Sequence, residues 1–454
     1  MLGSPLQYQS LMTVLLHTDA NTRFRISTHM PSIRNVERRI PLKVNRLMMS
    51  KQCTVVNDTS YRLEVVRYHP AGSMYPWPTK VKDGRWTFDF DEFGFQVNVG
   101  QNVLLPGDIS FQMGDEIEEP NETEEIEMFR KKRLEIHEKA VELLTYLESE
   151  PEIVTKYIET LDPDSVYPIL NCLHTPLEDL QRFVKREKLE LLPFECRRNN
   201  VKSPFKYFIE LTVTKRSSQH IKRFEYTKKH FEAVKQLHEV FFGGRSEPVL
   251  VQLLDLIPYH FTPPNGIYRL PTDCRLHANQ VNALDHNLAH ASFPLLVGNS
   301  ESLDTLWVRC ISDSGVLRNQ MVRSSKKLVI DYLRVIAGMG GLIRDLANRE
   351  ISMVTPRRLS FPMHYAALIN AWLRGKRPAG ALFWVQVKSD KEAREVLRMV
   401  GERHANAERI ERCVTIPRDN ATKANIYYTP TEGPKLSRYN SVREWTLKVE
   451  IVNV

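Results

Sequence analysis

The sequence lacks any apolar run long enough to cross a membrane. A spanning helix needs about 20 consecutive apolar residues, and no stretch of the 454 residues approaches that length. The first segment, Met1 to Leu16, lacks the basic leader of a secretory signal, and Gln7, Gln9 and Ser10 interrupt its apolar residues. We therefore expect an intracellular protein, in the cytoplasm or the nucleus, with no membrane partner.

The sequence also lacks closely spaced cysteines. Its six cysteines are scattered along the chain, at Cys53, Cys172, Cys196, Cys274, Cys310 and Cys413. No two of them form the short pairs that mark metal or redox motifs. In a reducing compartment we expect them to be free thiols inside the fold.

Motifs of common enzymes are missing as well. The run Gly338–Gly341 resembles part of a phosphate-binding loop, but no Lys-Ser or Lys-Thr follows it. A turn after an apolar helix explains these glycines better. The sequence has no Gly-x-Ser-x-Gly nucleophile elbow and no paired carboxylates outside an acidic helix start. We predict a protein that is not an enzyme, has no catalytic residues and needs no cofactor.

One group of residues has spacing that suits a metal ion: Cys274, His277, His286 and His290. A helix would place the last two histidines on one face, as zinc sites often do. The segment between them lacks the Glu that metalloproteases place after the first His. Surface histidines beside a buried cysteine are the better interpretation, and we predict no metal site.

Charge is the most informative feature that is present. Hydrophobic residues make up 42% and charged residues 26% of the chain, a balance typical of globular proteins. The net charge is +8, yet residues 115–127 carry eight acids and no base. The rest of the chain is therefore twice as positive as the whole. Such a surplus favours acidic partners, either nucleic acid or an acidic protein surface.

The first 114 residues divide into two segments. Residues 1–41 predict short helices, because Leu11 and Leu15 lie four apart on one helix face and Asp19 provides capping chemistry. Residues 42–114 predict a small β-rich module, because Tyr61–Val65 and Trp86–Phe90 alternate with the period of a strand.

Residues 115–195 predict a charged helical insert. No Gly or Pro interrupts Glu122 to Glu150, and residues that favour helices dominate, so we expect a long exposed helix there. Prolines should divide the helical sequence that follows into short pieces, at Pro151, Pro163, Pro168 and Pro176.

Residues 196–454 predict alternating strands and helices. An amphipathic helix should run from Thr227 to Phe242, where Gly243-Gly244 ends it. Later strands begin at spacings of roughly 20–30 residues, near Leu306, Leu328, Ile351 and Phe383. This pattern predicts a leucine-rich-repeat-like solenoid, a recognition domain in which each unit packs on its neighbours. The predicted fold class of the whole chain is α+β.

The N-terminal segment resembles the opening of an F-box. Pro5-Leu6 precedes an apolar helix, an Asp-centred break, the Arg-rich run Asn21–Ser27 and then Pro31. Other stretches resemble one expanded family of Caenorhabditis proteins, the F-box C group with the domain of unknown function 3557. These stretches are Thr54–Leu63, Phe93–Phe95, Leu105–Ser110, Pro193–Asn200 and Ile369–Trp372. Together the matches cover nearly the whole chain.

The resemblance implies a role in ubiquitination. F-box proteins generally dock a Skp1-type adaptor through their N-terminal helices and present a protein substrate to a cullin ubiquitin ligase. Carried over to this chain, it implies a docking surface formed by Pro5, Leu6, Leu11, Leu15 and Asp19. Apolar anchors in a groove are the physical mode expected for such docking. The alternative is that these residues only pack the helices against the β-rich module.

Two other functions remain open. Pairs and clusters of basic residues could together follow a phosphate backbone, although most such clusters in proteins are solvated surface. They lie at Arg197–Arg198, Lys215–Arg216, Lys222–Arg223, Lys228–Lys229, Arg323–Lys327, Arg357–Arg358 and Arg374–Arg377. The chain could thus bind nucleic acid, or be an interaction scaffold with no link to ubiquitin.

Overall fold

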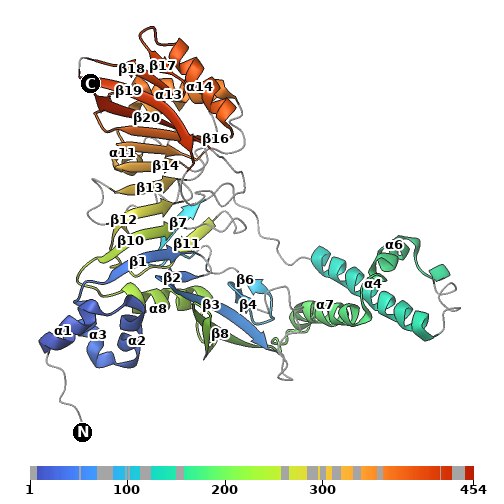
Figure 1. The fold of residues 1–454 in the computed structure, drawn as a ribbon. Helices are drawn as coiled ribbons and strands as arrows, with labels where there is room; N and C mark the ends of the chain where they lie inside the picture. Colours follow the sequence, from blue (N-terminus) through green and yellow to red (C-terminus); the bar gives the residue numbers. More distant parts are fainter. Residues whose placement is uncertain are drawn as a thin grey trace. The chain divides into compact units, whose positions relative to one another are not determined.

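The fold is a mixture of helix and sheet in a computed structural model, which confirms the predicted α+β class (Figure 1). The structure describes residues 8–50, 53–68, 85–97, 100, 103–112, 124–149, 158–256, 265–283, 295–296, 303–308, 319–330, 339–354, 361–419, 421–431 and 445–454. The chain forms two compact units. Unit 1 comprises Met1–Ser60, Leu105–Gly114 and Leu237–Val454, and unit 2 comprises Tyr61–Leu104 and Asp115–Gln236. None of the helices among these described residues is long and apolar enough to span a membrane.

Unit 1 begins with the predicted short helices. They are α1 (Tyr8–His17), α2 (Ala20–His29) and α3 (Pro31–Arg38). Asp19 caps α2, because its Oδ2 accepts hydrogen bonds from the backbone N–H groups of Asn21 and Thr22, at 3.0 and 3.3 Å. Pro31 occupies the start of α3, where a missing N–H costs nothing.

Most of unit 1 is a ladder of parallel strands. In spatial order these are β1 (Lys43–Met49), β10 (Val249–Leu256), β12 (Leu276–Ala283), β13 (Thr305–Val308), β14 (Lys327–Ile330), β15 (Glu350–Met353) and β16 (Leu382–Val387). We call them the ladder (Figure 1). The last four confirm the strands predicted near Leu306, Leu328, Ile351 and Phe383. The first strand comes from the segment grouped by sequence with the β-rich module, yet it pairs with β10.

Antiparallel strands flank the ladder on both sides. β2 (Thr54–Val56) pairs with β1 on one side. On the other side β20 (Trp445–Asn453) pairs with β16, followed by β19 (Thr422–Pro430), β18 (Cys413–Pro417) and β17 (Glu408–Ile410). A separate pair, β7 (Ile109–Gln112) and β11 (Asn265–Tyr268), also belongs to unit 1.

One buried row of side chains crosses every strand of the ladder. In register its members are Leu47, Leu254, Val281, Leu306, Leu328, Ile351 and Phe383, and all are fully buried. A second buried row lies two residues further along each strand, because alternate side chains of a strand face the same side. Each fully buried aliphatic or aromatic side chain contributes about 1.5–3 kcal/mol, so these rows form the core of unit 1.

A helix follows each of the last three strands of the ladder in the chain. These helices are α12 (Met339–Asp345) after β14, α13 (Pro362–Leu373) after β15 and α14 (Asp390–Glu402) after β16. Trp372 of α13 is fully buried, with its ring 5.6 Å from that of Phe383 on β16. The turn predicted for Gly338–Gly341 was wrong, because Gly340 and Gly341 lie within α12.

A buried arginine holds two of these helices together. Arg377 donates hydrogen bonds to the carbonyl oxygens of Ile343, Arg344 and Leu346, at and beyond the end of α12, and to that of Trp372 in α13. These carbonyls belong to helix ends, where carbonyl oxygens lack the regular N–H partner four residues further along the helix. Burial lowers the pKa of the Arg377 guanidinium to about 10.

We expect Arg377→Met to lower the free energy of unfolding by about 3 kcal/mol, because several buried carbonyl oxygens would lose their donor. Lys376→Met removes a charge from the neighbouring exposed position and should change stability by less than about 0.5 kcal/mol. Urea denaturation of the full chain measures both. Equal effects of the two substitutions would show that Arg377 is not a structural cap.

Unit 2 contains four strands of the long sheet order and the helical insert. Its strands are β3 (Thr59–Tyr68), which enters the unit at Tyr61, β4 (Arg85–Trp86), β8 (Lys206–Lys215) and β9 (Ser218–Glu225). β8 and β9 form an antiparallel hairpin. Two short strands, β5 (Asp89–Phe90) and β6 (Gln96–Val97), pair with each other. Helix α8 (His230–Phe242) starts in unit 2, continues into unit 1 and ends before Gly244, which has a positive φ of 66°.

The predicted insert is a cluster of three helices, α4 (Glu124–Ser149), α6 (Pro163–Cys172) and α7 (Leu177–Arg198). The long helix is confirmed, but it is not exposed all round, because Ala140 and Leu143 pack with Ile169 and Leu180 in a buried core. Pro168 lies inside α6, so this proline does not end a helix as predicted.

Candidate protein-interaction surface

Helix α1 presents apolar side chains on both sides of a buried stripe. Leu15 is 1% exposed and belongs to the core, whereas its neighbours Val14 and Leu16 are 49% and 40% exposed. Tyr8 at the start of the helix is 50% exposed. A single exposed apolar residue is ordinary, but α1 exposes three of them within ten residues, on both sides of the stripe. We call Tyr8, Val14 and Leu16 the α1 surface.

The structure places the residues predicted for adaptor docking in different environments. Pro5 and Leu6 lie outside the described residues. Leu11 is partly buried on α1, and Leu15 is buried. Asp19 caps α2 and accepts a hydrogen bond from Asn57 Nδ2 at 3.1 Å. Their role in docking stays a prediction.

Sequence reasoning missed Val14 and Leu16. It followed the spacing of four between Leu11 and Leu15, and this spacing marks the stripe that faces the protein. The signal for the exposed apolar residues was available, because Val14 and Leu16 lie on either side of that stripe on a helical projection.

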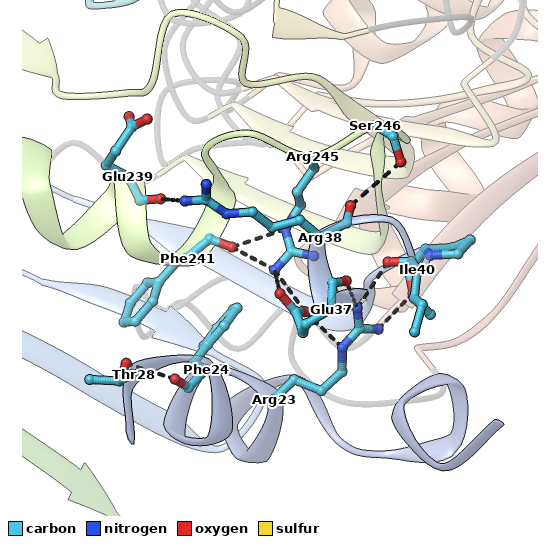
Figure 2. A network of polar contacts seen from close by, with 11 residues as sticks. Arg23, Phe24, Thr28, Glu37, Arg38, Ile40, Glu239, Phe241, Arg245 and Ser246 are labelled. Carbon is cyan, nitrogen blue, oxygen red and sulfur yellow. Dashed lines mark hydrogen bonds and ion pairs between the residues drawn. The ribbon is translucent and has the colours of Figure 1, made fainter. Parts of the chain in front are cut away.

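A buried charge network attaches the N-terminal helices to the rest of unit 1 (Figure 2). Arg23 of α2 donates from Nε to Glu37 Oε1 of α3 at 2.9 Å. Arg245, just beyond α8, donates to both carboxylate oxygens of Glu37, at 3.0 and 3.2 Å. All three side chains are at most 4% exposed. Burial lowers the pKa of both guanidiniums, and the Glu37 carboxylate opposes this effect.

The same guanidiniums also bind backbone carbonyl oxygens. Arg23 donates to those of Glu37, Ile40 and Pro41, at 2.9, 2.9 and 2.7 Å. Arg245 donates to the carbonyl oxygen of Phe241 in α8, at 3.0 and 3.1 Å. A buried charge is tolerated when hydrogen bonds satisfy most of its polar atoms, and of the nitrogens in these two guanidiniums only Arg245 Nη1 lacks a partner among the described residues. Two guanidiniums share one carboxylate, so the group has one positive charge in excess. Carbonyl dipoles at the C-terminal ends of α3 and α8 stabilise that charge.

Aromatic packing reinforces this attachment. The ring of Phe24 in α2 stacks on that of Phe241 at 4.4 Å and meets the edge of Phe242 at 6.2 Å. Asn21 Nδ2 donates to the carbonyl oxygen of Val56 in β2 at 3.0 Å. The N-terminal helices and the ladder are thus held in a fixed relative orientation within unit 1.

The ladder carries polar side chains between its buried rows. Asp255 of β10 pairs with Arg46 of β1 at 2.6 Å and accepts from Asn282 of β12 at 2.7 Å. Further along the ladder, Glu350 of β15 pairs with Lys327 of β14 at 2.6 Å and accepts from Trp384 Nε1 of β16 at 3.1 Å. Of these side chains, Arg46 and Trp384 are of types enriched on surfaces that bind proteins.

Several basic residues of the predicted clusters have internal partners. Lys326 pairs with Asp304 at 2.7 Å, Arg223 pairs with Glu210 at 2.8 Å, and Arg377 is buried as described above. The pair Arg357–Arg358 lies outside the described residues. These members of the basic clusters are therefore engaged within the fold and are less available to a phosphate backbone.

The structure describes two of the four residues considered as metal ligands. Cys274 is buried, which raises the pKa of its thiol to about 12, and His277 lies on β12. His286 and His290 fall outside the described residues. Within the described ranges, no group of three or more His, Cys, Asp or Glu side chains could hold a metal ion.

Comparison with known proteins gives one match. Residues 229–389, which contain α8 and the ladder from β10 to β16, match the family model of a domain of unknown function, DUF3557. No curated protein and no solved structure matches the chain. The part of the chain that carries most of the ladder is therefore similar to a domain to which no activity is assigned.

Proposed function

We propose that the protein is an F-box-like adaptor that recruits a protein substrate to a Skp1–cullin ubiquitin ligase. The α1 surface carries this proposal: it is apolar, accessible and located in the segment that resembles an F-box. Exposed apolar anchors of a helix that enter a groove are a common mode of protein recognition.

The buried network of Arg23, Glu37 and Arg245 also supports the proposal. Transfer of ubiquitin needs the substrate held at a defined place relative to the ligase, since positioning lowers the entropic part of the barrier. Arg23, Glu37 and Arg245 fix α2 and α3 to the end of α8. In this proposal α1 binds the adaptor, and the polar face of the ladder is the surface that holds the substrate.

A pull-down tests the docking role of α1. The full chain is compared with a double variant, Val14→Asp and Leu16→Asp, which places charges on the α1 surface while leaving Leu15 in the core. We expect the wild type to recover a Skp1-type adaptor and the variant to recover at least about tenfold less, because burying a charge in an apolar contact costs several kcal/mol.

The matched control is Ile410→Asp, which changes an apolar residue that is 74% exposed on β17. It should leave adaptor recovery unchanged. Circular dichroism confirms that each variant is folded. Recovery of no adaptor by the wild type, or equal recovery by the folded double variant, would contradict the proposal and leave an interaction scaffold with no link to ubiquitin.

A further inference from the structure

Strand β9 of unit 2 is a long sheet edge with unusual exposure. All eight of its residues, Ser218 to Glu225, are exposed. Among the described residues it pairs with β8 alone and is the last strand in the order of its sheet. Most proteins keep edge strands short or cover them, because an open edge offers unpaired backbone groups to other chains.

The hairpin register fixes which backbone groups are open. Arg216 and Ser217 form a two-residue turn, closed by the pair Lys215 and Ser218. In such a hairpin the closing pair exchanges hydrogen bonds, and every second pair after it does the same. His220, Lys222 and Phe224 therefore bond to β8. The intervening residues Gln219, Ile221, Arg223 and Glu225 direct their N–H and C=O groups away from β8, toward the open edge.

The side chains of β9 combine apolar and basic character. Ile221 is 40% exposed and Phe224 49% exposed. His220 and Lys222 share one face of the strand with Phe224, while Ile221 and Arg223 share the other. One lysine is enough to guard an edge against aggregation. Here each face of the strand carries a large apolar side chain and a basic one, Phe224 with Lys222 and Ile221 with Arg223, a combination that can bind a strand of opposite charge.

The charge of β9 indicates which kind of strand would bind at its open edge. Glu225 is the only acidic residue of β9, and Glu210 of β8 is already bound by Arg85 and Arg223, both at 2.8 Å. A second copy of this chain would place the same basic strand against itself, and like charges on adjacent strands repel. An acidic extended segment would instead pair its carboxylates with Lys222 and its apolar side chains with Ile221.

We propose that β9 binds an extended acidic segment of a partner protein as an added strand. Backbone hydrogen bonds from Ile221 and Arg223 would hold the segment, and the basic side chains would select its charge. This inference goes beyond the proposed function, since it concerns a surface in unit 2 and does not depend on adaptor docking by α1.

Peptide binding to the full chain tests the proposal. The probe is a fluorescent eight-residue peptide, the length of β9, in which Glu and Val alternate. Two further peptides carry N-methyl groups, one on every Val and the other on every Glu. A bound strand directs only alternate N–H groups to its neighbour. We therefore expect one methylated peptide to bind about tenfold more weakly, whereas the other binds like the parent.

Variants of the chain separate charge from backbone pairing. Lys222→Glu should weaken binding of the parent peptide about tenfold, while Lys228→Glu, an exposed lysine outside β9, should change it less than about twofold. Ile221→Pro removes an outward N–H group and should weaken binding more than Ile221→Ala does. Circular dichroism confirms folding of each variant, and the methylated peptides test backbone pairing without altering the chain.

Three results would overturn the proposal. The first is parent-like binding of both methylated peptides. The second is equal weakening by Lys222→Glu and Lys228→Glu, which would indicate a diffuse basic surface. The third is displacement of the peptide by a single-stranded DNA oligonucleotide that binds the Ile221→Pro variant as tightly as the wild type. That result would favour a surface that binds nucleic acid.

Discussion

Glu37→Gln should lower the free energy of unfolding of unit 1 by about 3–5 kcal/mol, because it leaves two buried guanidiniums without a counter-charge. Glu37 is the carboxylate shared by Arg23 and Arg245 in the network that attaches α2 and α3 to the end of α8 (Figure 2). The substitution keeps the size of the side chain, so lost packing contributes little. Urea denaturation of the full chain, followed by circular dichroism, measures the change.

The matched control is Glu239→Gln, an exposed glutamate on α8 whose loss should cost less than about 0.5 kcal/mol. A triple change of Arg23, Glu37 and Arg245 to Met separates two effects. It removes every buried charge, yet it also removes the donors to the carbonyl oxygens of Ile40, Pro41 and Phe241. We expect the triple variant to remain less stable than the wild type. If the triple variant were as stable as the wild type, the hydrogen bonds from the guanidiniums to the carbonyl oxygens would contribute nothing to stability.

Leu254→Ala should lower the free energy of unfolding by about 3–4 kcal/mol. Leu254 lies in the fully buried row of the ladder, between Leu47 of β1 and Val281 of β12. Packed strands on both sides cannot collapse into the space, so the cost of a cavity adds to the lost burial.

The control for this substitution lies in the same strand. Leu250→Ala makes the same chemical change at a residue that is 36% exposed, and it should cost less than about 1 kcal/mol. Comparable losses for the two variants would mean that the ladder is not closely packed at β10. The same denaturation experiment measures both.

Local patterns in the sequence predicted most helices and strands. The strands near Leu306 and Ile351 and the α8 helix were visible because apolar spacing and glycine stops act within a few residues. One predicted helix break was wrong. Pro168 lies inside α6, because packing of a helix against its neighbours can offset one missing hydrogen bond.

The repeated sequence pattern of the ladder was hard to recognise, because one of its apolar positions is polar in some repeats. In the first six strands of the ladder, two buried residues follow a buried residue that lies three positions before the first of them, as in Val251, Leu254 and Leu256. At that first position other repeats have Ser325 and Asn348, both buried. Asn348 there donates to the carbonyl oxygens of Val322 and Ser325, at 2.7 and 2.6 Å. A polar residue in an apolar column obscures the repeat until its hydrogen bonds are known.

The candidate site was harder to predict than the fold. The sequence indicated a docking helix, but the spacing of Leu11 and Leu15 marks its packed side rather than its exposed side. The buried network could not be predicted, because its members are distant in sequence and each resembles a surface charge. No periodicity distinguishes Glu37 from the neighbouring exposed residues of α3. Only the pairing of β1 with β10 brings the ends of α3 and α8 together.

The place of β1 in the ladder has a consequence for synthesis of the chain. Its parallel partner β10 begins at Val249, so about 200 residues separate the two, which at 5–20 residues per second takes the ribosome about 10–40 s. During that interval the apolar side chains of Leu47 and Phe24 have no partner from β10 or α8. The nascent N-terminus should therefore be a strong client for chaperones, and contacts so distant in sequence predict slow folding.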